Sequence, residues 1–158
     1  MHYLLDACAI LVICNEETGA HRVLGLLGQV RTGAVRLSMS IIQLLEVYYD
    51  RIYVAGENEA RIIIESIFDE PITIIDTISY QAMYEAGRLK ASYSISLADS
   101  IACAIAKNFD ATLVTKDKEI KTYQQDSRGC DDANRYYSYL FASTPRGMAI
   151  GRFARTGN

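Results

Sequence analysis

Two aspartates in the stretch 95–119, ISLADSIACAIAKNFDATLVTKDKE, are spaced so that they could share one site. The apolar spacing of 95–106 predicts a helix, and Ser96 as its N-cap would put Asp99 in the first turn, where the helix dipole stabilises negative charge. Asp117 follows 111–115, a β-branched run that predicts a buried strand. A helix of roughly ten residues and a strand of roughly five are both about 15 Å long, so the chain returns to the edge it left. Both carboxylates are therefore expected at the sheet edge where open α/β sheets bind ligands.

Two further acids occupy similar positions earlier in the chain. Asp6 follows the short apolar strand 3–5, and Glu46 lies within the apolar helix expected up to Tyr49. A buried carboxylate is costly, so Glu46 should have a cation, a hydrogen-bond donor or a shifted pKa. The helical wheel alone leaves Glu46 equally able to face solvent.

Each acid also has a simpler explanation. Asp99 could serve only as a helix-capping acid, and Asp117 could be an ordinary turn residue, because acids are common at both kinds of position. Asp76 follows the strand 72–75 and imitates the pattern, but capping of the next helix by Asp76 or Ser79 explains it sufficiently. The functional interpretation depends on several carboxylates meeting at one place.

A cluster of carboxylates is the oxygen-rich shell that Mg²⁺ or Mn²⁺ prefers, and such sites commonly act on phosphates. The chain has no G-x-G-x-x-G, P-loop, nucleophile-elbow serine or Cys–His pattern, which argues against dinucleotide, NTPase and triad chemistry. The four cysteines form no C-x-x-C pair, so a zinc site has little support. Cys8 and Cys103 lie among apolar residues and are predicted to be small core residues.

The elements that must position these acids alternate along the chain. Alternating strands and helices predict right-handed βαβ crossovers and a parallel sheet covered on both faces. The run 136–141 has strand character and is expected to form an edge strand after a long loop, with order through about Phe141. The expected strands are 3–5, 35–37, 72–75 and 111–115, and the expected helices are 7–12, 18–30, 38–49, 57–68, 80–91 and 95–106.

Composition indicates one globular domain. Of 158 residues, 50% are hydrophobic and 22% are charged, and a net charge of −3 argues against a protein that coats nucleic acid through bulk charge. The basic part is residues 128–158, with five arginines and two aspartates. The start of the chain has no basic region typical of a signal peptide, and no apolar run approaches membrane-spanning length, so a cytoplasmic protein is expected.

In order and context, the four acids resemble those of the PIN-domain family, and most closely the VapC-type ribonuclease toxins. The resemblance covers about residues 2–120, and LADSIACAIAKNFDATLVTKDKE is its most specific part. The sequence departs from the family in two places. Ala7 and Cys8 replace the hydroxyl residue that usually follows the first aspartate, and Gln43 in SMSIIQLLE stands where a small hydroxyl residue is frequent.

The resemblance implies a fold and a site. The fold is a three-layer α/β PIN-like domain with a central parallel sheet flanked by helices. Residues 1–127 would form the PIN-like catalytic domain, and 128–158 would be a divergent basic C-terminal extension of it. The metal ligands and catalytic residues would be Asp6, Glu46, Asp99 and Asp117, binding Mg²⁺ or Mn²⁺, with Thr115 and Ser40 supporting them or contacting substrate.

The resemblance also implies an activity. The chain would be a metal-dependent endoribonuclease that cleaves RNA phosphodiester bonds, the toxin of a toxin–antitoxin pair, inhibited by an antitoxin and forming a homodimer. The alternative is a catalytically weak PIN-like module that binds RNA or a protein partner. The isoleucine-rich face of 62–67 is expected to contribute to association. Basic residues would guide the RNA unless they are ordinary solvated charges, namely Arg88, Lys90, Lys116, Lys118 and Lys121.

Overall fold

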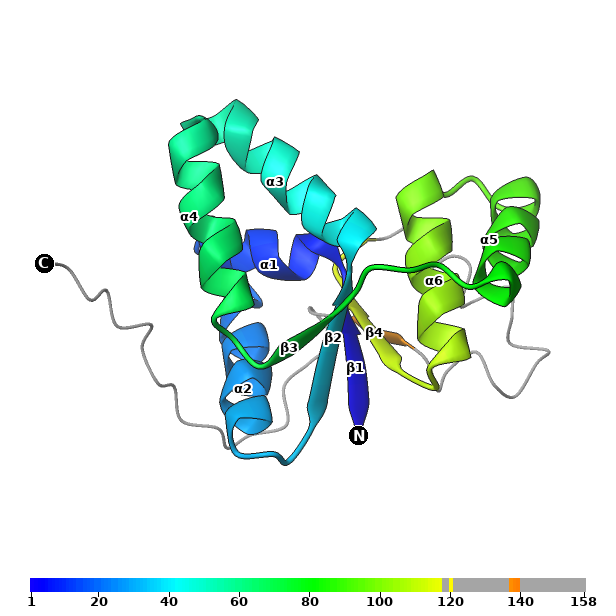
Figure 1. Cartoon of the computed structure of the whole chain (residues 1–158), viewed down its shortest axis with the longest axis horizontal. Coiled ribbons are helices and arrows are strands. Elements are labelled where there is room, and N and C mark those ends of the chain that lie inside the picture. Colours follow the sequence, from blue (N-terminus) through cyan, green and yellow to red (C-terminus); the bar gives the residue numbers. More distant parts are fainter. Residues whose placement is uncertain (118–119, 121–136, 140–158) are drawn as a thin grey trace, which may run out of the picture.

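The computed structural model describes residues 1–117, 120 and 137–139, and in them the strands form one parallel sheet. The strand order is β3-β2-β1-β4-β5, so the first strand lies at the centre (Figure 1). Each neighbouring pair is parallel, as the alternation of elements predicts. The strands are β1 His2–Leu5, β2 Arg36–Ser40, β3 Ile72–Ile75, β4 Thr112–Thr115 and β5 Tyr137–Tyr139.

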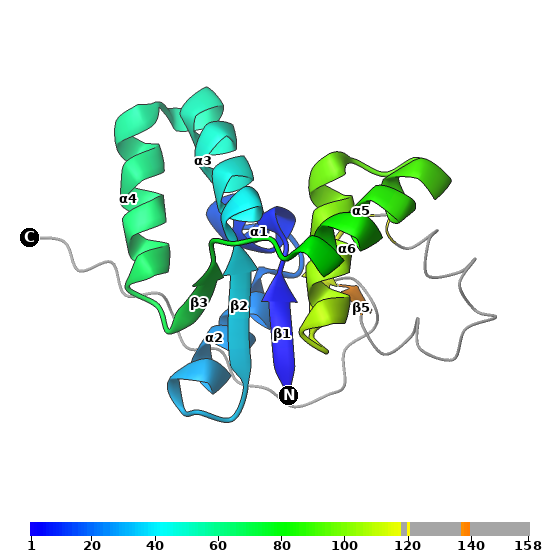
Figure 2. The ribbon, with the colours of Figure 1, turned by 45° about the vertical axis from the view of Figure 1, so that its right-hand side comes forward.

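Helices cover both faces of the sheet, which gives the expected three-layer α/β arrangement (Figures 1 and 2). Side chains alternate along each strand, so Leu5 and Val114 pack into the core on one face, and Leu4 and Leu113 into the core on the other. The first core includes residues of α1, α2, α3 and α4, and the second includes residues of α5 and α6. The helices are α1 Ala7–Cys14, α2 Ala20–Arg31, α3 Ile41–Ala55, α4 Glu57–Phe68, α5 Tyr80–Ser92 and α6 Leu97–Asn108.

The register of the strands brings the segments that follow them to one edge. Leu5 pairs with Met39 on one side and with Val114 on the other. The next residues, Asp6, Ser40 and Thr115, therefore lie together at the carboxyl ends of adjacent strands. This is the edge at which the sequence places the acidic residues.

The helix expected from residue 38 begins later, and that prediction is wrong. Residues 38–40 belong to β2, where all three pair with β3 and Ser38 and Met39 also pair with β1. Ser40 is the N-cap of α3 and accepts a hydrogen bond from the Gln43 amide at 3.4 Å. The helix also continues past the expected end at Tyr49 and stops at Gly56, whose φ of 86° favours glycine.

The expected edge strand is confirmed at its centre. Tyr137–Tyr139 forms β5 and pairs in parallel with β4, from Leu113 to Thr115. The rest of the run 136–141, the expected boundary at residue 127 and the remainder of the basic segment 128–158 lie outside the described residues. No described helix combines the length and the apolar character needed to cross a membrane.

The isoleucine-rich face of α4 is used inside the domain. Ile67 is buried, and Ile63 and Ile64 pack against the core, whereas Ile62 is exposed. Most of this face is therefore used within the domain, and its contribution to association stays a prediction. The exposed apolar side chains of α3 form a stripe at helical spacing, namely Ile41, Leu45, Tyr49 and Ile52.

Candidate active site

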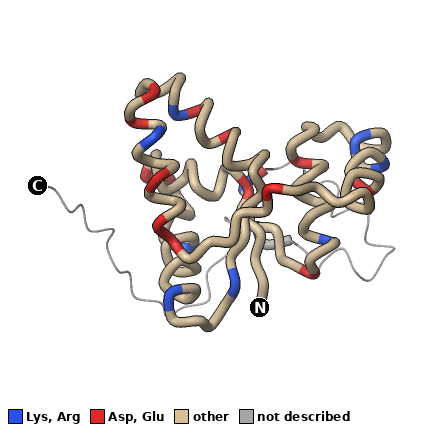
Figure 3. The backbone as a smooth tube through the Cα atoms, viewed as in Figure 1, with Lys and Arg blue, Asp and Glu red and all other residues tan. Residues whose placement is uncertain are grey.

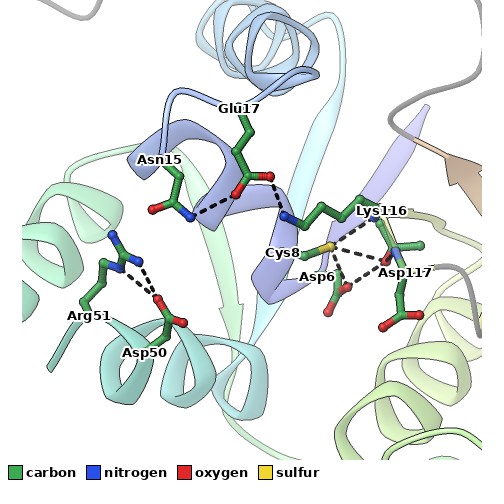
Figure 4. A network of polar contacts seen from close by, with 9 residues as sticks. Asp6, Cys8, Asn15, Glu17, Asp50, Arg51, Lys116 and Asp117 are labelled. Atoms are coloured by element: carbon green, nitrogen blue, oxygen red, sulfur yellow. Dashed lines mark hydrogen bonds and ion pairs between the residues drawn. The ribbon is translucent and has the colours of Figure 1, made fainter. Parts of the chain in front are cut away.

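Asp6 is the most restrained acid of the site. It follows β1 and caps α1, and its Oδ1 accepts a hydrogen bond from the Ala7 amide at 2.8 Å. Its Oδ2 accepts from Cys8 Sγ at 3.0 Å and from Thr115 Oγ1 at 2.8 Å. With 3% of its surface exposed, the carboxylate is held in one orientation by groups from α1 and β4 (Figure 4).

Burial raises the pKa of Asp6 above its usual range. The hydrogen bonds from Cys8 and Thr115 oppose this shift because they stabilise the ionised form, whereas the charge of Asp99 adds to it. The repulsion shows that Asp6 and Asp99, which lie 93 positions apart in the sequence, are electrostatic neighbours in the fold.

Asp99 occupies the third position of α6, as the sequence predicts. Ser96 Oγ accepts from the Asp99 amide at 2.9 Å, and Asp99 Oδ2 accepts from the Ser96 amide at 3.3 Å, which completes a capping box. The simpler explanation as a capping acid is therefore correct for one carboxylate oxygen. Its charge still acts on Asp6, so capping and membership of the acidic cluster are compatible.

Glu46 faces the cluster, which settles the choice that the helical wheel leaves open. Burial, followed by the charges of Asp6 and Asp99, raises the pKa of Glu46 to about 7. Three carboxylates, from the residue after β1 and from α3 and α6, therefore repel one another at the carboxyl edge of the sheet. This is the electrostatic arrangement expected where a cation is to be held.

Asp117 is attached to the same network through its backbone. Its amide donates to Thr115 Oγ1 at 3.0 Å, and the Lys116 amide donates to Cys8 Sγ at 3.0 Å. Thr115 thus donates to Asp6 and accepts from Asp117, which supports its predicted place beside the acids. Figure 4 shows Asp117 on the same side of the network as Asp6.

The donor set fits a hard divalent cation in its chemistry, because it consists of carboxylates and the neighbouring charges of Asp6, Glu46 and Asp99 repel one another. Among the described residues, no three Asp, Glu, His or Cys side chains are already gathered closely enough to hold a metal ion. A cation would therefore have to draw the carboxylates inward.

One other acid and two hydroxyl residues lie near the starts of α3 and α5. Ser40 is fully buried and donates to the Gln43 side chain while it caps α3, so its hydrogen bonds fix the helix start. Asp76 is exposed and accepts from Thr77 Oγ1 at 3.0 Å. Ser79 is the N-cap of α5, which confirms one of the two capping residues expected there.

The basic residues expected to guide RNA make contacts within the chain. Lys116 Nζ pairs with Glu17 at 2.6 Å, and Arg88 pairs with Glu85 at 2.8 Å. Lys90 Nζ donates to the Ile95 carbonyl at 2.6 Å. Lys118 and Lys121 lie outside the described residues. Figure 3 shows Lys and Arg distributed over the outer helices of the described part.

The prediction that Cys8 is a small core residue is wrong. Cys103 is buried in the core as predicted, but Cys8 is only partly buried and its thiol bonds to Asp6 and to the Lys116 amide. Its position, two residues after a strand-end aspartate and in place of a hydroxyl residue, is the signal that could have identified it. Gln43 is similarly missed, although it lies three residues before Glu46 and hence on the same helix face.

The raised pKa of Glu46 predicts a pH dependence of stability in metal-free protein. An acid with a higher pKa in the folded state binds more protons when folded, so the melting temperature should fall as pH rises from about 4.5 to about 7. Glu46→Gln should flatten this slope, whereas Glu65→Gln at an exposed position of α4 should leave it unchanged. Thermal melts across this range measure it, and equal slopes in all three proteins would contradict the assignment.

The Cys8 contacts predict different effects for two substitutions. Cys8→Ala removes the donor to Asp6 and the acceptor for the Lys116 amide, and should lower the free energy of unfolding by about 1–3 kcal/mol. Cys8→Ser retains both functions and should lose less than half as much. Cys14→Ala, a similar truncation of another partly buried thiol on α1, is the control for urea denaturation. Equal losses in Cys8→Ala and Cys8→Ser would contradict this role.

Comparison with known proteins agrees with the fold. A model described as the PIN domain matches residues 3–125. No curated protein matches the chain significantly. Solved structures resemble it at low sequence identity, so these likenesses concern the fold.

Three of these structures are informative. VapBC-1 from nontypeable Haemophilus influenzae has a TM-score of 0.63 at 17% identity and covers 90% of this chain and 100% of its own. VapBC2 from Rickettsia felis, bound to a promoter DNA fragment, has a TM-score of 0.61 at 23% identity, and the match covers 77% of this chain and 92% of the VapBC2 chain. A toxin–antitoxin complex from Klebsiella pneumoniae has a TM-score of 0.59 at 18% identity, and the match covers 88% of this chain and 98% of the chain from that complex. With a family match over most of its length, this chain belongs to the PIN-domain family.

Proposed function

We propose that this chain is a divalent-metal-dependent endoribonuclease that hydrolyses RNA phosphodiester bonds. The observation that carries the proposal is the meeting of Asp6, Glu46 and Asp99 at the carboxyl edge of the sheet, where the acids repel one another. Membership of the PIN-domain family supports nuclease chemistry at such a cluster. Asp117, joined to Asp6 through Thr115, is the fourth residue assigned to metal binding and catalysis.

The protein residues have distinct parts in this mechanism. A bound Mg²⁺ or Mn²⁺ would polarise a phosphate oxygen and lower the pKa of the attacking water. Asp6 presents a carboxylate whose orientation is fixed by Ala7, Cys8 and Thr115. Asp99 is fixed by its capping box with Ser96. Burial and the charges of Asp6 and Asp99 raise the pKa of Glu46, and a nearby positive charge would lower it again, so that Glu46 would ionise.

We further propose that the nuclease is the toxin of a toxin–antitoxin pair and acts in the cytoplasm under the control of an antitoxin protein. The toxin assignment is supported by the fold likeness to structures described as VapBC and toxin–antitoxin complexes. The second candidate function is a catalytically weak module that binds RNA or a protein partner. The raised pKa of Glu46 favours the enzyme, because a module that only binds a partner has no need of mutually repelling acids.

RNA cleavage by purified protein tests the activity. Wild-type protein should cleave a labelled RNA with Mg²⁺ or Mn²⁺ and not with EDTA. Asp99→Asn should lose about a hundredfold or more, because metal-assisted charge stabilisation is worth several kcal/mol. Asp76→Asn, at an exposed strand-end acid outside the site, should cleave as wild type does. The same ions should raise the melting temperature of wild type but not of Asp6→Asn, Asp99→Asn or Asp117→Asn.

The outcomes separate the two candidate functions. RNA binding without metal-dependent cleavage would favour the binding module. Equal metal-induced shifts in wild type and the three site variants would contradict a shared metal site. Cleavage that survives Asp99→Asn while Asp76→Asn abolishes it would place the chemistry elsewhere.

We propose a homodimer that uses the exposed stripe of α3 rather than α4. Leu45 is 54% exposed and Tyr49 is 47% exposed, and large aromatic side chains are favoured at interfaces. Light scattering should give a dimer mass for wild type, and Leu45→Glu should shift the mass to that of the monomer. Met83→Glu, at an exposed apolar position of α5, is the control. A monomer mass at every concentration would contradict the dimer.

A further inference from the structure

Gln43 makes a buried contact between the two helices that carry Glu46 and Asp99. Its side chain lies in α3 and is fully buried, and its Nε2 donates to the Ala98 carbonyl of α6 at 2.9 Å. Its Oε1 accepts a hydrogen bond from Ser40 Oγ. Both ends of the amide are therefore satisfied, and the described part of the chain contains no buried side-chain N or O atom without a partner.

The position of this contact relates it to the acidic site. Gln43 and Glu46 are three residues apart and lie on the same face of α3. Ala98 immediately precedes Asp99 in the first turn of α6. One hydrogen bond thus joins the residue one turn before Glu46 to the residue next to Asp99.

The helices need such a connection at this point. α3 and α6 approach each other at their N-terminal ends and diverge beyond the sheet edge (Figures 1 and 2). Glu46 and Asp99 repel each other, so electrostatic repulsion tends to separate the N-terminal ends of the two helices. Ser40 fixes the Gln43 amide from the end of β2, which leaves the side chain a single useful direction, across to α6.

We propose that Gln43 is a positioning residue that sets the spacing between Glu46 and Asp99 by tying the first turn of α3 to the first turn of α6. This role rests on the proposed metal-dependent activity, because the spacing matters for a cation held between the two carboxylates. Gln43 does not touch the substrate or the cation itself. It acts as the outer partners of metal ligands do, by orienting groups that bind.

Gln43→Met tests the tie, because methionine has a similar length and packs in a buried position but cannot donate to Ala98. Hydrogen exchange in metal-free protein should be about 2- to 10-fold faster in the first turn of α6, the factor expected for one lost hydrogen bond. Leu44 is the neighbouring buried residue, and it packs in the core that does not include α6. Leu44→Met should therefore leave hydrogen exchange in the first turn of α6 unchanged. Unchanged exchange in Gln43→Met overturns the proposal, whatever the metal response.

Metal titration followed by melting temperature tests the consequence. Gln43→Met should need about tenfold more Mn²⁺ for half of the maximal stabilisation, the lower end of the loss seen for outer partners of ligands. RNA cleavage should show a reduced kcat at limiting Mn²⁺, an unchanged KM for RNA and recovery at saturating Mn²⁺. Leu44→Met should move the melting temperature without moving the half-maximal metal concentration.

The outcomes distinguish this proposal from the function on which it rests. If wild type responds to Mn²⁺ and Gln43→Met responds identically, the positioning role is overturned and the nuclease proposal stands. If wild type shows neither stabilisation nor cleavage with any divalent ion, the nuclease proposal fails and the purpose assigned to Gln43 fails with it. Faster exchange together with the weaker metal response supports both.

Discussion

Mutual repulsion of buried carboxylates is the constraint on which this structure depends. Asp6, Glu46 and Asp99 come from different elements, and burial together with the neighbouring charges makes the ionised forms of Asp6 and Glu46 less stable than they would be in water. The fold must hold them together against this repulsion in the metal-free state. It does so with hydrogen bonds that stabilise or fix each carboxylate and with a sheet whose strands all end at the same edge.

Helix N-termini provide part of the compensation. Asp6 is the N-cap of α1, Asp99 lies in the first turn of α6, and Glu46 lies in the second turn of α3, which Ser40 caps. The positive ends of three helix dipoles therefore lie near the acids, and parallel strand topology requires this, because each helix begins close to a strand's carboxyl end. The same topology that creates the repulsion thus also supplies fixed partial charges that reduce it.

The extent of sequence-based prediction differs between elements for physical reasons. The placement of Asp99 in a first helical turn could be predicted because the Ser96 cap and the apolar spacing are local signals. The start of α3 could not, because residues 38–40 gain strand pairing and this depends on β1 and β3. The orientation of Glu46 also needed the fold, since a helix that is apolar nearly all round gives no preferred face. The prediction for Cys8 is wrong for a related reason, because two of its three partners, Thr115 and Lys116, lie more than 100 positions away in the sequence.

The two places where the chain departs from the common family pattern, Cys8 and Gln43, are both filled by side chains that bond across elements. The thiol of Cys8 donates to Asp6 at 3.0 Å and accepts from the Lys116 amide at 3.0 Å. A small hydroxyl side chain at position 43 would be too short to reach both Ser40 and the Ala98 carbonyl, so the amide makes a connection that the frequent residue could not. The first substitution connects α1 to the segment after β4, and the second connects α3 to α6. Together they join the elements that carry all four acids. At both positions, a residue that departs from the common family pattern therefore makes hydrogen bonds between these elements.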